Sequence, residues 1–209
     1  MLRVPVEKTR SPERFVASPL GIKSWREQLP TCAEARPARC PCCDAAARPV
    51  SGTLIVVGHG VDERQHLGPL APGEPPVAAT VIVRRYRCRA CAAILVVGPA
   101  GLVRRRWYSG AAIAAALATY ARGASSSAVR AATSPSGAVG PSAQERWITL
   151  TRWIDAAQVG KLFGVAGVRG GEDRRRVAEQ VAVALAARAG RAFGDDLVAK
   201  AFEGAAIAA

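Results

Sequence analysis

The stretch Cys40-Pro41-Cys42-Cys43, together with Cys88-Arg89-Ala90-Cys91, decides the fold that we expect for this chain. Each stretch places two cysteines three positions apart, a spacing that lets one tight turn direct two thiolates at a single ion. Two such turns supply the tetrahedral four-sulfur shell that zinc adopts in structural sites. We therefore predict a structural zinc ion, with no open coordination position for catalysis, held by Cys40, Cys43, Cys88 and Cys91.

Two other uses of these cysteines stay open on the sequence alone. A Cys-Pro-x-Cys pair is also typical of thiol oxidoreductases, where it starts a helix in a βαβ unit, but no such pattern surrounds Cys40. Free cysteines also serve as small buried apolar side chains. The spacing leaves Cys32 and Cys42 outside the metal shell. We expect His59 and His66 to be structural, because four sulfurs already fill the shell.

The residues around the cysteines predict a small, loop-rich β unit. Apolar and β-branched residues favour strands at Thr53–Val57, Ala79–Arg87 and Ala93–Val97. Because 44 residues separate the two cysteine pairs, a hairpin between them would bring the pairs together. A structural metal contributes on the order of 10 kcal/mol to folding, and a unit with so many loops needs such a contribution.

From Ser109 onward the pattern becomes helical. Ser109 and Ser125 are suited to cap two short helices separated by Gly123, and the capping box of Ser142 and Glu145 precedes a third. Three helices in this order are typical of a helix-turn-helix domain, and generic three-helix packing explains the same pattern. On the third helix, one face is expected to be buried and Trp153 to flank it; the buried positions are Trp147, Leu150, Ile154 and Ala157.

The expected fold class is therefore α+β, with a small zinc-ribbon-like β unit followed by a helical, helix-turn-helix-like region. The expected limits are an N-terminal extension over 1–30, a zinc-ribbon-like domain over 31–106, a trihelical domain over 107–158, a linker over 159–171 and a C-terminal helical segment over 172–209. That last segment has two apolar faces, which favour pairing with another protein or with a second copy of the chain in a homo-oligomer. One face comprises Val177, Val181 and Leu185, and the other comprises Leu197 and Phe202.

The charge of the chain indicates a polyanionic partner. Its 209 residues carry a formal net charge of +13, and half of them are hydrophobic, which excludes wholesale disorder. Drift of a GC-rich genome toward Arg accounts for part of the excess, but not for its placement, since Arg84–Arg106 holds seven Arg and no acid. We expect double-stranded DNA as the partner, contacted by Arg84, Arg85, Arg87, Arg89, Arg104, Arg105, Arg106, Arg130 and Arg152.

Other classes of protein are not favoured. No apolar run approaches the roughly 18 residues that a membrane helix needs, and Met1–Leu20 lacks the apolar core of a secretory signal. We therefore expect a cytoplasmic protein with no membrane partner, associated with the nucleoid if it binds DNA. Common hydrolase, P-loop and zinc-protease motifs are absent from the sequence, so we expect no enzyme activity.

Taken in order, these motifs resemble the N-terminal region of bacterial insertion-sequence transposases and of their short stand-alone relatives of uncharacterised function. The resemblance covers roughly residues 35–158 and rests on Cys40-Pro-x-Cys43, Gly58-His59-Gly60, Arg84–Cys91 and Gly101–Ser109. It implies a zinc-binding domain ahead of a helix-turn-helix that recognises DNA ends, with the four paired cysteines as zinc ligands.

This chain departs from that family in two respects. The family often has glycine directly after the second cysteine of each pair, where this chain has Asp44 and Ala92. About 50 residues follow the third expected helix, too few for the RNase-H-like catalytic domain of a transposase. The resemblance therefore implies DNA binding without the catalysis of transposition.

Overall fold

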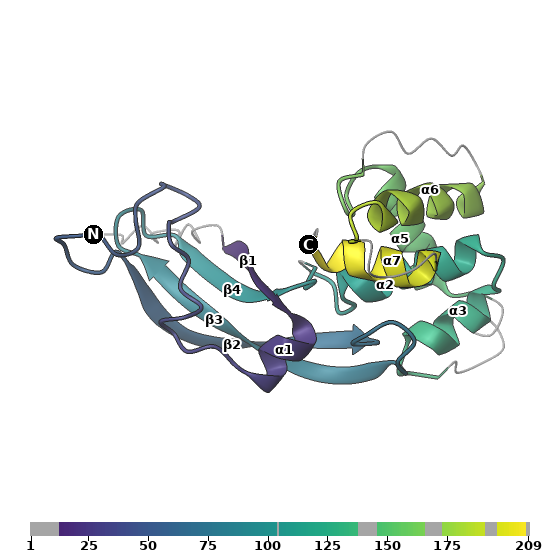
Figure 1. Ribbon diagram of the computed structural model, residues 1–209, viewed down its shortest axis with the longest axis horizontal. Helices are drawn as coiled ribbons and strands as arrows, with labels where there is room; N and C mark the ends of the chain where they lie inside the picture. The colour runs from purple at the N-terminus through teal and green to yellow at the C-terminus, as the bar shows by residue number, and fades with distance from the viewer. Residues whose placement is uncertain (1–12, 104, 138–145, 166–172, 191–195, 208–209) are drawn as a thin grey trace, which may run out of the picture.

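The computed structural model describes residues 13–103, 105–137, 146–165, 173–190 and 196–207. A four-stranded sheet lies at one end of the molecule and a group of helices at the other (Figure 1). The described residues thus form a mixed α+β structure with six helices, which confirms the expected class at this level. No helix among them is long and apolar enough to cross a membrane.

The sheet has the strand order β1-β4-β3-β2. Its antiparallel part is a long hairpin of β2 and β3 extended by β4, and β1 lies parallel to β4 at the far edge. The bounds are β1 Arg14–Gly21, β2 Val56–Gly68, β3 Val77–Cys88 and β4 Ile94–Ala100. Strands β3 and β4 include most of the second and third strands expected from the sequence.

The strand β2 is far longer than the sequence pattern indicated. It begins only at Val56 and continues to Gly68, through a register shift between Gly58 and Val61. Its middle residues are exposed, Asp62 and Glu63 among them. An edge strand can carry such charges in solvent while its backbone pairs on one side only, and therefore it lacks the apolar pattern of a buried strand.

Part of the segment expected as an N-terminal extension belongs to the sheet. Both β1 and the short helix α1 (Ile22–Glu27) lie within residues 1–30. Trp25 of α1 is fully buried, and its Nε1 donates a 2.7 Å hydrogen bond to the backbone oxygen of Ile82 on β3. Nothing local revealed β1, because Pro19 interrupts its pattern and its only partner, β4, is distant in the sequence.

The helices α2 and α3 begin at the caps that the sequence predicts. The Oγ atoms of Ser109 and Ser125 accept hydrogen bonds from backbone amides in the first turns of α2 and α3. Gly123 has a φ of 101° between these helices, a conformation that glycine adopts freely. The capping box at 142–145 lies outside the described residues. The helix bounds are α2 Gly110–Ala121, α3 Ser126–Thr133, α5 Ile148–Gln158, α6 Arg174–Ala186 and α7 Leu197–Ile207.

The helical core is larger than a three-helix unit. The expected face of α5 is buried, and Trp153, which we expected at its side, is 1% exposed. The rings of Tyr108, Trp147 and Trp153 meet edge to face, with centroids 5.0 to 5.9 Å apart. This aromatic cluster explains the burial of Trp153, since Tyr108 precedes the first helix and supplies a ring that the pattern of α5 alone does not show. Leu162, within the expected linker, is also buried in this core.

The helices α6 and α7 complete this core instead of standing apart. Both pack against α2 and against each other (Figure 1). The apolar face expected to bind a partner is buried within the chain: Val177, Val181 and Leu185 are at most 1% exposed, and Phe202 is buried as well. The observation that favoured pairing through residues 172–209 is thus explained by packing within one chain.

The end of β2 joins the sheet to the helices. The amide of Leu67 donates a 2.8 Å hydrogen bond to the oxygen of Trp107, and the amide of Gly110 donates one of 2.7 Å to the oxygen of Gly101. At Gly68, where φ is +117°, a Cβ would lie 2.5 Å from that of Ala112 on α2. Only glycine permits both this conformation and this close approach.

A glycine also sets the distance between α6 and α7. A Cβ on Gly204 would overlap the carbonyl oxygen of Leu185. We expect Gly204→Ala to lower the free energy of unfolding by about 1–3 kcal/mol, because overpacking forces the helices apart. Gly190→Ala is the matched control, since a Cβ there meets nothing within 4 Å. Equal denaturant midpoints for the two variants would contradict this account of the packing.

Candidate metal centre

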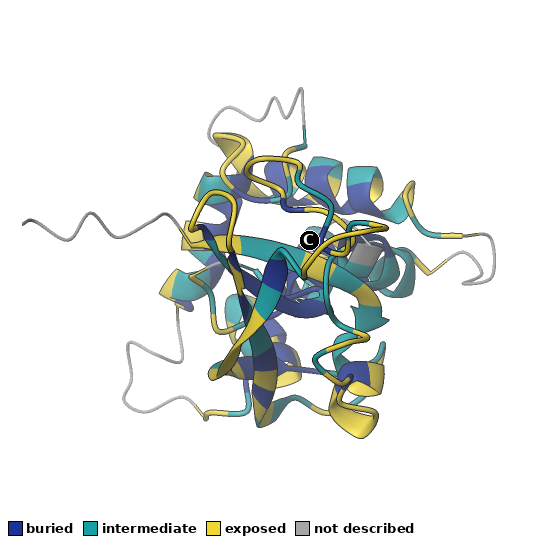
Figure 2. Cartoon of the chain, turned by 90° about the vertical axis from the view of Figure 1, so that its left-hand side faces the viewer, coloured by how far each residue is buried: buried dark blue, intermediate teal, exposed yellow. Residues whose placement is uncertain are grey.

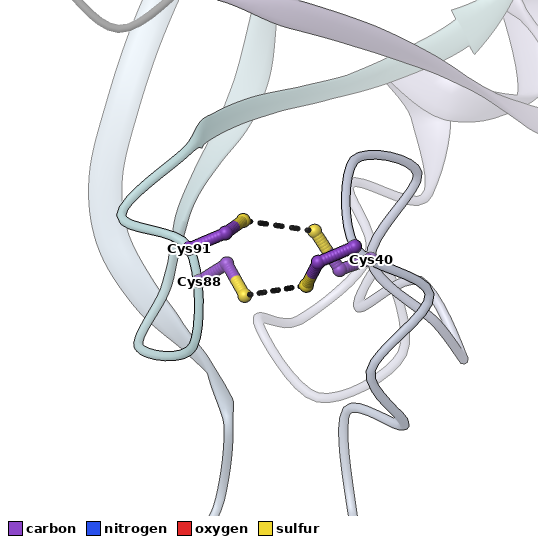
Figure 3. A group of neighbouring side chains, drawn as sticks. Cys40, Cys88 and Cys91 are labelled. Carbon is purple, nitrogen blue, oxygen red and sulfur yellow. Dashed lines mark hydrogen bonds between the residues drawn. The ribbon is translucent and has the colours of Figure 1, made fainter.

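Two turns bring the four paired cysteines together at the sheet end of the molecule (Figure 3). The Sγ atoms of Cys40 and Cys91 are 3.7 Å apart, and so are those of Cys43 and Cys88. All four sulfurs lie within 4.8 Å of one another. A tetrahedral ion with metal–sulfur bonds of about 2.3 Å holds its sulfurs about 3.8 Å apart. The cluster therefore fits a metal ion with four sulfur ligands.

The two turns share one backbone design. The amide of Cys40 donates to the oxygen of Ala45, and that of Cys88 donates to the oxygen of Ala93, at 2.9 and 3.0 Å. In each case the first cysteine bonds to the residue five positions later, which closes the turn and turns both thiols to the same side. The first cysteine of each pair is buried and the second exposed. The second turn follows directly on β3, so the sheet positions it.

The residue after each pair has the backbone conformation that a turn of this kind needs. Asp44 has a φ of 57° and Ala92 a φ of 58°. These are the positions at which the resembling family often carries glycine. Asp44 is further held by Arg39, whose Nε and NH2 donate 2.7 Å hydrogen bonds to its carboxylate. Ala92 has a methyl group in a region that disfavours it, so the second turn is strained where the first is supported.

The electrostatics of the cluster favour a bound cation. Burial opposes ionisation of Cys40, but hydrogen bonds from the backbone of Cys42 and Cys43 outweigh it and lower the pKa of the thiol to about 7. The amide of Ala93 favours the thiolate of Cys91, yet burial and the neighbouring sulfurs raise its pKa to about 12. Four thiolates this close repel one another strongly, and a divalent cation at their centre removes that cost.

The other candidate ligands lie outside the cluster. Cys32 is half-buried and its Sγ accepts a long contact of 3.8 Å from Arg36, while Cys42 is exposed on the first turn. His66 is fully buried at the opposite end of β2, where burial lowers its pKa to about 4. His59 is exposed on β2. None belongs to the group of clustered ligand atoms among the described residues.

Each cysteine pair faces the other pair. The two shortest sulfur contacts each join one thiol from the first turn to one from the second. Cys40–Cys43 lies in a turn, whereas a redox-active pair of the thioredoxin kind begins a helix. The arrangement can thus link two distant segments through an ion.

The arginines expected to contact DNA occupy different surroundings. Arg87 and Arg89 are exposed beside the second turn, and Arg105 and Arg152 are exposed elsewhere. The others are half-buried: Arg84 donates from Nε to the oxygen of Pro30, Arg130 donates to the oxygen of Gly137, and Arg85 and Arg106 complete this group. Arg104 lies outside the described residues.

A hollow beside the metal centre was not predicted from the sequence. Its volume is about 440 Å³, and it is lined by Val57, His59, Arg87, Cys88, Arg89 and Ala92. The Gly58-His59-Gly60 motif could have indicated it, because glycines within a strand mark an irregularity that can redirect the side chain between them.

The chain matches no protein-family model, and comparisons with curated proteins and with solved structures found no match either. The resemblance to transposase N-terminal regions therefore stays a prediction from the motifs.

We expect Cys88→Ser to abolish metal binding and to unfold the sheet end, because three sulfurs cannot complete the shell and the two turns lose their link. Cys42→Ser is the matched control: this thiol lies on the same turn as Cys40 and Cys43 but outside the cluster. Metal content by mass spectrometry and circular dichroism check both variants. Stoichiometric metal in Cys88→Ser, or its loss in Cys42→Ser, would contradict the assignment of the ligands.

The strain at Ala92 leads to a second prediction. Ala92→Gly should raise the free energy of unfolding of the metal-loaded protein by about 1 kcal/mol, because glycine adopts a positive φ without the steric penalty. Ala90→Gly, in the same turn but without a positive φ, should instead destabilise slightly. The measurement is denaturant unfolding at saturating metal. If both variants changed the free energy of unfolding in the same direction, the role assigned to the φ of Ala92 would be refuted.

Proposed function

We propose that this protein is a non-catalytic, zinc-stabilised DNA-binding protein. The observation that carries the proposal is that β3 brings exposed arginines of the acid-free run Arg84–Arg106 to the edge of the four-sulfur cluster. Arg87 and Arg89 flank a proposed zinc ligand, Cys88, so metal binding fixes the backbone that carries both guanidinium groups. Charges held rigidly in this way are suited to the phosphates of a duplex.

Zinc is the ion that the donor set favours. Four thiolates select zinc or iron–sulfur chemistry over calcium and magnesium, which prefer oxygen ligands. A mononuclear shell with sulfurs about 3.7 Å apart fits a structural zinc site and supports zinc as the ion. A shell closed by four cysteines leaves no position for a substrate, which supports a role in folding and positioning.

The helices support a helix-turn-helix reading in one respect. Four residues, Arg122 to Ser125, separate α2 from α3, and Gly123 has a positive φ among them. Turns of three or four residues with a glycine are typical of this motif. The relation to transposase end-recognition regions, and a location in the cytoplasm with the nucleoid, belong to the same proposal.

The test is duplex binding by the metal-loaded full chain, measured by fluorescence anisotropy from 50 to 300 mM salt. If the four exposed arginines each neutralise one phosphate, the logarithm of the association constant falls with that of the salt concentration at a slope of about −3 to −4. Removal of the metal should abolish binding. No binding by folded, metal-loaded protein at the lowest salt would refute the proposal.

A further inference from the structure

Three arginines of the hairpin lie on one face of the sheet. Successive side chains of a strand alternate between faces, so Arg85 and Arg87 of β3 share a face with Val81. Directly paired residues of antiparallel strands also share a face, and the register pairs Val81 with Arg64 of β2. Arg64, Arg85 and Arg87 therefore lie on one face of the sheet. Val81 and Val83 of the same face are fully buried, so on β3 this face opens to solvent only near Arg87, at the metal centre. Asp62, which pairs with Val83, is the acid of this face on β2.

The hollow beside the metal centre lies at the end of this face. Its lining contains His59, Arg87 and Arg89, all exposed, and no acidic residue. Among the described residues, no carboxylate forms an ion pair with Arg87 or Arg89. Figure 2, in which this end faces the viewer, shows the loops around it largely exposed. The hollow thus gathers two guanidinium groups that no carboxylate among the described residues neutralises.

The backbone around the hollow is built to place His59 there. The register of β2 and β3 shifts between Gly58 and Val61, and Gly60 has a φ of +94°. Such a bulge redirects side chains away from the regular alternation. A Cβ at Gly58 would lie 2.7 Å from the Sγ of Cys32, so a larger residue would displace the strand. The Gly58-His59-Gly60 motif therefore serves the shape of this site.

Arg89 is positioned by the metal-binding turn. Its amide donates a 2.9 Å hydrogen bond to the oxygen of Ile55, and the amide of Cys88 before it donates to Ala93. Arg87 lies in the regular ladder, opposite Val57 on β2 and Ile94 on β4. Both guanidinium groups thus extend from backbone that the ladder and the turn already hold.

The helix α3, which follows the glycine-containing turn after α2, offers little for reading bases. The exposed positions of α3 are Ser127, Ala128, Ala131 and Ala132. Alanine side chains are short and donate no hydrogen bonds, whereas base recognition uses long polar side chains such as Arg, Asn and Gln. On the described helices, the exposed arginine of α5 is Arg152. Exposed arginines also lie on α6, at Arg174 and Arg176, but Arg174 pairs with Asp155, whereas the lining of the hollow contains no acidic residue.

We propose that the hollow of His59, Arg87 and Arg89 is the surface that binds the phosphate backbone of duplex DNA, without regard to base sequence. This inference rests on the proposed function and assigns its contact surface to the sheet instead of to the helices. The occupant is a run of phosphodiesters, because the lining supplies two guanidinium groups and an imidazole as hydrogen-bond donors and contains no acidic residue.

The experiment compares two double variants of the metal-loaded full chain on the same labelled duplex. Arg87→Ala/Arg89→Ala should weaken binding at least tenfold at low salt and reduce the salt slope by about 2, since each lost phosphate contact removes about 0.9. Arg174→Ala/Arg176→Ala removes the same charge from exposed positions of α6 and should stay within about twofold of wild type. Unrelated duplexes should compete equally.

Folding is controlled by the metal content and by Arg87→Lys/Arg89→Lys, which keeps both charges and should retain most of the binding. If wild type binds and Arg87→Ala/Arg89→Ala binds equally well, the contact surface is wrong and the proposed function stands. A loss of binding confined to the helix variant, or a strong preference for one duplex, also overturns the proposed contact surface and leaves the proposed function standing. Failure of wild type to bind any duplex overturns both proposals.

Discussion

The mutual approach of four sulfur atoms is the constraint on which the sheet end depends. One pair of thiols sits on a turn among loops and the other on the turn between β3 and β4. Without a link between them, residues 31–55 would be attached to the sheet by few bonds, of which the hydrogen bond from the Tyr86 hydroxyl to the oxygen of Cys32 is one. An ion shared by both turns would make this long, loop-rich segment part of the core, in which Cys40 and Cys88 are already buried.

How much of this could be predicted from the sequence differs between elements. The four clustered cysteines follow from their spacing, because a turn with two thiols three apart is a local structure. The caps at Ser109 and Ser125 are local in the same sense. The strand β1 was not predicted because it pairs in parallel with a strand that is distant in the sequence, and such a pairing has no local sequence pattern. The length of β2 was not predicted because an edge strand need not alternate in polarity. The placement of Trp153 depended on Tyr108, a ring from another segment.

The helices illustrate the same distinction between a pattern and its use. The sequence shows the apolar faces of α6 and α7, but it does not show which element covers them. In the structure α2 covers these faces, and α2 is so rich in alanine that other helices can approach it closely. The alanines of α2 thus have a structural use, because small side chains allow a central helix to contact several neighbours.

The parallel pairing of β1 with β4 has a consequence for the order in which the protein is made. Seventy-two residues separate the end of β1 from the start of β4, and synthesis proceeds at about 5–20 residues per second. The first strand therefore waits for several seconds, with its backbone unpaired, until the last strand of the sheet emerges. All four cysteines precede β4 in the chain, so the ion can bind before the sheet closes. The metal would then gather the nascent chain while β1 is still an open edge, the stage at which unpaired strands are most prone to aggregate.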